Sequence, residues 1–140
     1  AADAAGADAV IACSGTVDVS SPKVVRASAG SVFHLPSIVN VGFDEVAEWV
    51  KSRKMSLVAA DGHGSVNLFD AQDGMESLDL AAPTAWVFGN EAHGFAQLDE
   101  SVIDHSVSIP LGGHAESLNV SAAAAICLFA TAKARHRMRV

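Results

Sequence analysis

Short apolar segments alternate with longer amphipathic segments along the 140 residues of the chain. The short segments have the length and composition of buried strands. They are residues 9–12, 38–41, 56–60, 85–88 and 107–109. Three of the longer segments are expected to be helices, and they are residues 22–29, 44–51 and 117–137. Strands that alternate with helices predict an α/β fold with a mainly parallel sheet flanked by helices.

Capping residues mark the start of two of these helices. Ser21 precedes Pro22, and this pair suits the N-cap and the first helical position. Asp44 is the expected N-cap of the next helix. The apolar face of that helix, which we expect to be buried, consists of Val46, Ala47 and Val50. Residues 65–82 show no clear period, so no regular element is assigned there.

Composition narrows the class of protein. Half of the residues are apolar and 18% are charged, which fits a globular domain and excludes a disordered chain. Trp49 and Trp86 are interpreted as core residues. Cys13 and Cys127 lie in separate apolar runs without a CxxC partner, so we expect buried reduced thiols, no metal and a cytoplasmic location. The apolar run 118–132 is shorter than the about 20 residues of a membrane span, so no membrane partner is expected.

The charge of the chain limits its binding partners. A formal net charge of −7 argues against a domain that clamps a phosphate backbone by itself. The cations are nevertheless grouped, in residues 51–54, in residues 133–139, and at Lys23 and Arg26. The first two groups are expected to form solvated surface. Lys23 and Arg26 are candidate RNA contacts, and a structural salt bridge is an equal alternative for Arg26.

Two loops follow predicted strands near the C-terminus and carry glycine with small polar residues. They read FGNEAHGF (88–95) and IPLGGHAESLNVS (109–121). Ligands of open α/β sheets bind at the carboxyl ends of strands, so these loops are candidate ligand sites. Two ordinary turns, with Ser117 as a helix N-cap, are an equally good interpretation. Neither GxGxxG nor a P-loop is present, so the standard nucleotide-binding motifs are excluded.

The same loops resemble signatures of the SpoU (TrmH-like) branch of the SPOUT methyltransferases. FGNEAHG (88–94) is similar to FGNEGxG, and IPLGGHAESLNVSAAAAI (109–126) is similar to IPMxGxxESLNVSxAxxI. SPKVVRASAGSVFHLP (21–36) resembles a third stretch of many members. The chain departs from these patterns at Ala92, usually Gly, and at Leu111, usually Met. The matches keep the family order over nearly the whole chain, which is therefore identified as a member of this family.

The resemblance implies a deep C-terminal trefoil knot and S-adenosylmethionine as the cofactor. Three residues match positions whose main chain holds the cofactor, namely Gly89, Ile109 and Leu118. Three others match polar residues of the active site, namely Glu91, Ser117 and Asn119. Glu91 and a relay through Ser117 are both open as the route for proton removal.

The resemblance also indicates what residues 1–140 are expected to lack. The first family motif, NxGxxxR, should precede Ala1, and many relatives add an N-terminal RNA-binding domain. A chain without the arginine of that motif is expected to be inactive by itself. We favour a truncated enzyme over a naturally inactive protein.

The leading functional hypothesis is S-adenosylmethionine-dependent 2′-O-methylation of a ribose in ribosomal or transfer RNA, with ribosomal RNA preferred. The alternative is a non-catalytic module that binds RNA or cofactor, and an NAD-type oxidoreductase is disfavoured by the missing GxGxxG. We also expect a homodimer. The segment 118–132 is apolar almost all round, and a helix of this kind is buried on more than one face. Burial of that helix wholly within one chain is the competing interpretation.

Overall fold

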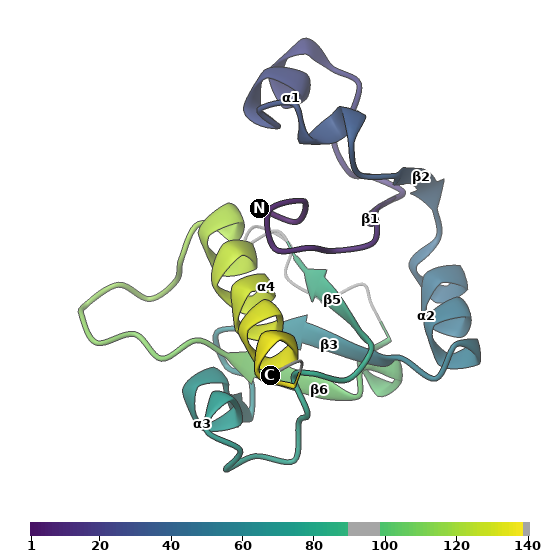
Figure 1. Cartoon of the computed structure of the whole chain (residues 1–140). Helices are drawn as coiled ribbons and strands as arrows, with labels where there is room; N and C mark the ends of the chain where they lie inside the picture. The colour runs from purple at the N-terminus through teal and green to yellow at the C-terminus, as the bar shows by residue number, and fades with distance from the viewer. Residues whose placement is uncertain (90–98, 139–140) are drawn as a thin grey trace.

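The computed structural model describes residues 1–89 and 99–138, and its centre is a parallel sheet of four strands (Figure 1). The strands are β3 (Ser56–Ala60), β4 (Val66–Asn67), β5 (Thr84–Phe88) and β6 (His105–Ser108). Their order across the sheet is β4-β6-β3-β5. All of their carboxyl ends therefore meet at one edge of the sheet.

The N-terminal part of the described chain forms a second, smaller sheet. β1 (Val10–Cys13) and β2 (Ser37–Val41) pair in parallel, with a register shift between Ala12 and Cys13. The helix α1 (Pro22–Ala27) and a 3-10 turn (Ser31–Phe33) connect them. α2 (Phe43–Ser52) then leads to β3. The chain is thus an α/β protein with parallel sheets flanked by helices, as the sequence predicts.

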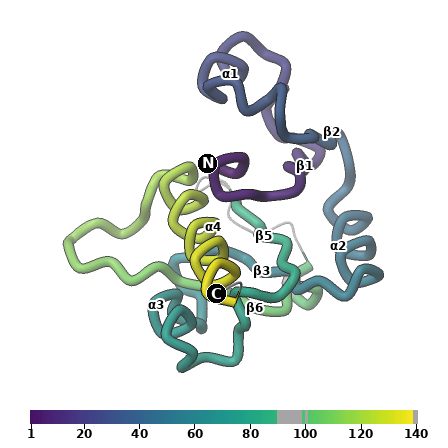
Figure 2. Tube along the Cα trace, viewed as in Figure 1, coloured from purple at the N-terminus to yellow at the C-terminus, as the bar shows by residue number. Residues whose placement is uncertain are grey.

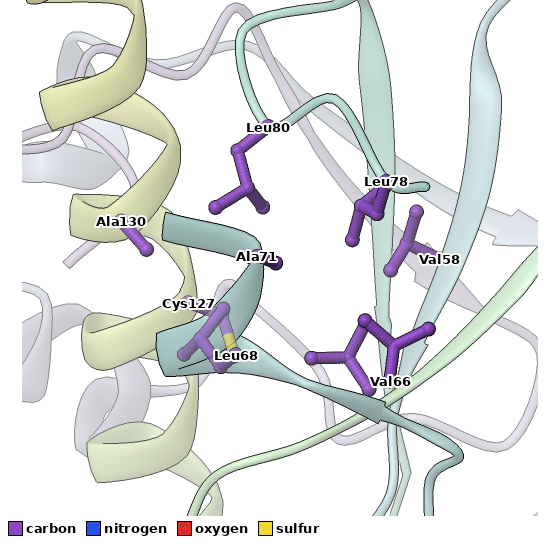
Figure 3. Packing of buried hydrophobic residues seen from close by; sticks show 9 residues of the cluster. Val58, Val66, Leu68, Ala71, Leu78, Leu80, Cys127 and Ala130 are labelled. Atoms are coloured by element: carbon purple, nitrogen blue, oxygen red, sulfur yellow. The ribbon is translucent and has the colours of Figure 1, made fainter. Parts of the chain in front are cut away.

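Helices cover both faces of the four-stranded sheet. On one face, α3 (Leu68–Gln72) and α4 (Val120–Arg137) enclose a cluster that includes Val58, Val66 and Cys127 (Figure 3). On the other face, Ala47 and Val50 of α2 pack against Leu57. Burial of these side chains on both sides explains why β3 is a continuous apolar run rather than an alternating one.

One connection crosses over a strand of the sheet. β4 follows β3 directly in sequence, yet β6 lies between them. Val107 pairs with Ala60 on one side and with Val66 on the other, so residues 61–65 pass over β6 at this level. The crossing is close, since a Cβ added to Gly64 would lie 2.6 Å from both the backbone nitrogen and the carbonyl carbon of Val107. We call residues 61–65 the crossing loop.

After β6 the chain emerges from beneath the crossing loop, and it then forms the last helix. β6 ends at Ser108, and Pro110, two positions further on, has no N–H with which the ladder could continue. Residues between β6 and α4 then swing away from the sheet and return to the start of α4 (Figure 2). Asn119 is the N-cap of α4, and its Oδ1 accepts a hydrogen bond from the Ser121 N–H at 2.9 Å.

The predicted boundaries hold for most elements, and four expectations are wrong. Residues 65–82 contain β4 and α3, where no element was assigned. The N-cap of α2 is Gly42, and Asp44 lies within its first turn. α4 begins at Val120, so Asn119 and not Ser117 caps it. Trp49 is 47% exposed and lies beside Arg53, outside the core.

Two further expectations concern the thiols and the membrane. Cys127 is fully buried in the main core, whereas Cys13 is only half-buried at the end of β1. None of the helices among residues 1–89 and 99–138 is both long and apolar enough to cross a bilayer.

Candidate functional site

A cavity of about 340 Å³ opens at the carboxyl edge of the four-stranded sheet. The ends of β3, β5 and β6 form its base, and the segment that leads into α4 forms its outer wall. Gly89 follows β5, and Ile109 follows β6, so both predicted loops begin at this cavity. The position agrees with the general location of ligand sites in open α/β sheets.

The structure brings together four of the residues that the sequence singles out. Gly89, Ile109, Ser117 and Leu118 all line the cavity, although almost thirty positions separate the first from the last. β5 and β6 are not neighbours in the sheet, because β3 lies between them. The fold therefore places Gly89 and Ile109, where the two loops begin, on opposite sides of the end of β3.

Asn119 has a structural contact of its own. Its side chain caps α4 through the bond to the Ser121 N–H, and the residue lies between Leu118 and Val120, which both line the cavity. The cap occupies the carbonyl oxygen of the side chain and leaves its NH₂ group available. Glu91 falls outside the residues that the structure describes.

Lys23 and Arg26 are exposed on α1, and neither of them lines the cavity. α1 belongs to the part of the chain that carries the two-stranded sheet, whereas the cavity belongs to the four-stranded sheet (Figure 1). Their assignment as RNA contacts stays a prediction.

The crossing loop supplies site residues that the sequence reasoning did not select. Asp61 and Gly62 of this loop line the cavity, together with Ala60, the last residue of β3. The Asp61 N–H donates to the Val107 carbonyl at 2.9 Å, and the Asp61 carboxylate accepts the His63 N–H at 3.0 Å. These bonds fix the loop over β6. One feature of the sequence indicates that Asp61 lies at the site, namely that it directly follows a buried strand.

The cavity combines apolar walls with an acidic character. Its apolar lining includes Ala60, Phe88 and Ile109, which also pack against the main core. Asp61 and Glu116 are the acidic residues among the described lining, and no lysine, arginine or histidine accompanies them there. This combination suits a ligand that has both an apolar part and a positive charge.

The two cysteines do not belong to this site. Burial raises the pKa of the Cys127 thiol to about 12, and it also raises the pKa of Cys13. Thiols with raised pKa values are poor nucleophiles at neutral pH. Within residues 1–89 and 99–138, no three His, Cys, Asp or Glu side chains converge into a group that could hold a metal ion.

Comparison with known proteins places this chain in a family. Residues 1–129 match the model of the SpoU rRNA Methylase family. A 23S rRNA (uridine(2479)-2′-O)-methyltransferase from Streptomyces viridochromogenes is 37% identical over 139 residues, which cover 96% of this chain and 46% of that protein. A 23S rRNA (guanosine-2′-O-)-methyltransferase, RlmB, from Bordetella pertussis is 33% identical over 134 residues, covering 96% of this chain and 52% of that protein.

Comparison with solved structures also finds SpoU methyltransferases. The crystal structure of the SpoU methyltransferase AviRb from Streptomyces viridochromogenes matches with a TM-score of 0.85 and 36% identity, covering 98% of this chain and 52% of that chain. The AviRb complex with AdoMet matches with a TM-score of 0.82 and 35% identity, over 99% of this chain and 53% of that one. The chain thus spans about half the length of these relatives. The family match over residues 1–129 confirms the resemblance of the motifs, and the chain belongs to the SpoU rRNA methylase family.

Proposed function

We propose that this chain carries the cofactor-binding and catalytic part of an S-adenosylmethionine-dependent RNA 2′-O-ribose methyltransferase. The observation that carries the proposal is the meeting of Gly89, Ile109, Ser117 and Leu118 at one cavity. These residues belong to the two loops whose sequences are similar to the family signatures. The two relatives described above are named as 23S rRNA 2′-O-methyltransferases. These names favour ribosomal RNA over transfer RNA as the substrate.

The residues of the cavity fit S-adenosylmethionine. This cofactor has a flat, largely apolar adenine at one end and a positively charged sulfonium near the other. Ala60, Phe88 and Ile109 provide apolar surface for the first, and the acidic lining favours the second. The main chain of Gly89, Ile109 and Leu118 would hold the cofactor, as the family resemblance implies. When bound, the cofactor supplies the methyl group of the reaction.

The protein has two tasks in transfer to a ribose 2′-oxygen. It must hold the hydroxyl in line with the methyl donor, and positioning of this kind can remove about 7–11 kcal/mol of a barrier. It must also accept or relay the hydroxyl proton. Ser117 lies on the cavity wall and can take part in a relay, while the NH₂ group of Asn119, which the helix cap does not use, can orient the RNA. Glu91 stays a candidate for the base on the strength of the family pattern alone.

We also propose that the region from β6 to α4 is knotted. The support is the crossing loop, because the chain beyond Ser108 has to leave from beneath residues 61–65 before it forms α4. Such knots are rare exceptions to the rule that chains do not thread through loops. An experimental structure whose chain could be pulled straight from both ends would contradict the knot.

A homodimer through α4 is a further part of the proposal. One side of α4 is buried in the core at Cys127, Ala130 and Thr131. Another side exposes Ile126 by 37% and Phe129 by 49%. Large apolar side chains in a row on one helix are typical of a contact surface. A cytoplasmic location, expected from the reduced thiols, and RNA contacts by the paired cations Lys23 and Arg26 also belong to this proposal.

The test is transfer of a labelled methyl group by the full-length protein. The substrates are 23S rRNA and a tRNA mixture, and the RNA is digested to nucleosides afterwards. We expect label in a 2′-O-methylated nucleoside from 23S rRNA. Label in a base, or no transfer to any RNA, would contradict the proposed activity, and label from tRNA alone would contradict the proposed substrate.

A further inference from the structure

Two aromatic side chains connect the cavity with the interior of the protein. Trp86 and Phe88 are two positions apart on β5, so both point to the same face of the sheet. Their rings are stacked, with 6.1 Å between the centroids and 15° between the planes. Phe88 lines the cavity, whereas Trp86 lies behind it against the main core. The stack therefore fixes one wall of the cavity from within.

The inner end of this stack, Trp86, is anchored to α4. The Trp86 Nε1–H donates a hydrogen bond of 3.0 Å to the Thr131 hydroxyl. Thr131 is only 7% exposed, and among the described residues it is the buried polar side chain of the core. Trp86 is partly buried, and the bond gives its indole N–H an acceptor inside the protein. The bond restricts rotation of Trp86, and the stack passes this restriction on to Phe88.

We propose that Thr131 is a positioning residue of the cofactor cavity. Through Trp86 it holds the Phe88 ring as the wall against which the adenine base packs. Phe88 is the aromatic side chain of the described lining, and it is flanked by the apolar Ala60 and Ile109. Aromatic rings and bases attract each other through offset faces, so a ring held still loses little freedom on binding. The inference rests on S-adenosylmethionine as the cofactor proposed above.

The contact between Phe88 and adenine is tested by replacing the ring. Phe88→Leu keeps an apolar side chain but removes the aromatic face. The probes are S-adenosylmethionine and 5′-methylthioadenosine, which keeps the adenosine but lacks the amino-acid part. Calorimetric titration of the full-length variant is expected to show both affinities reduced about tenfold, since stacking on one ring has this order of effect. A loss for S-adenosylmethionine with none for 5′-methylthioadenosine would overturn the assignment, and so would no loss for either.

Phe69→Leu is the matched control for this substitution. Phe69 lies on α3, is 48% exposed and does not line the cavity. Its replacement removes an aromatic ring of the same size, so the affinities are expected to stay as in the unchanged protein. If the unchanged protein bound neither probe, the proposed function itself would fail. If the unchanged protein and the Phe88→Leu variant bound both probes with equal affinity, only the proposed contact between Phe88 and adenine would fail.

The role of Thr131 is tested with a pair of variants. Thr131→Val keeps the shape but removes the acceptor of the Trp86 bond, whereas Thr131→Ser keeps the hydroxyl. We expect the valine variant to bind S-adenosylmethionine about threefold more weakly, as for loss of one modest hydrogen bond, and the serine variant to restore the affinity. Binding is read by calorimetry and by fluorescence.

Fluorescence can report on Trp86, since residues 1–140 contain two tryptophans and Trp49→Phe removes the other one of this segment. In that background, cofactor binding is expected to change the emission of Trp86, because its partner Phe88 lines the cavity. The change should be smaller when Thr131 is valine. A valine variant that is less stable but binds with unchanged affinity would reduce Thr131 to a purely structural residue and overturn the proposal.

Discussion

Gly64 is the position where the account of the crossing loop can be tested most sharply. A Cβ at this residue would lie 2.6 Å from two backbone atoms of Val107 and 2.7 Å from the carbonyl carbon of Ser106. Backbone atoms of a central strand cannot move aside as the end of a flexible side chain can. Overpacking of this kind costs about 1–3 kcal/mol and occasionally more, and contacts with three backbone atoms place Gly64→Ala at the upper end of that range, about 3 kcal/mol.

The assay is equilibrium unfolding in urea, with a parallel thermal scan. A loss of about 3 kcal/mol corresponds to a fall in Tm of roughly 10 °C for a domain of this size. Gly62→Ala is the matched control, because Gly62 belongs to the same loop and a Cβ there would meet nothing within 4 Å. That variant should be neutral or slightly stabilising, by about 0.5 kcal/mol. Equal stability of the two variants would refute the close passage of the loop over β6.

Three further outcomes are expected. Asn119→Ala should lower the free energy of unfolding by about 1 kcal/mol, because the bond to the Ser121 N–H is lost. Asn119→Asp keeps this cap, so it should stay stable but lose methyl transfer if the amide NH₂ orients RNA. The native protein should react with iodoacetamide at Cys13 before Cys127. Burial raises the pKa of Cys127 from 9.0 to about 12, so the contribution of the buried thiol to stability should be lost as the pH rises from 9.0 to about 12. The urea midpoint should fall over this pH range. Phe129→Glu should give a monomeric mass in light scattering, and a dimeric mass would exclude this face of α4 as the interface.

The elements that the sequence predicts well are those with a clear local cause. β3 was expected over residues 56–60 and is found at Ser56–Ala60, because an apolar run buried on both faces is visible without knowledge of its neighbours. β4 has two residues and α3 has five, so neither is long enough to show a period. Trp49 was expected in the core, but the smaller Ala47 and Val50 fill the buried face of α2.

The residues of the candidate site also divide into those with a local cause in the sequence and those whose place depends on distant parts of the chain. Gly89 and Ile109 could be predicted to lie at one edge of a sheet, because each follows a strand and parallel strands end together. Asp61 could not be selected, since its place depends on β6 pairing with β3 across more than forty residues of sequence. The stack of Trp86 on Phe88 could be suspected from their spacing on one strand, but the bond to Thr131 needs the packing of α4.

The central claim, that the cavity at the carboxyl edge of the sheet binds S-adenosylmethionine, is tested most directly by calorimetric titration of two forms of the full-length protein. Leu118 lines the cavity and is half-buried, so Leu118→Trp places a large ring in the space that the cofactor would occupy. We predict that the unchanged protein binds one cofactor per chain and that the Leu118→Trp variant remains folded but shows no binding. Binding of the cofactor with unchanged affinity by the folded Leu118→Trp variant would contradict the account.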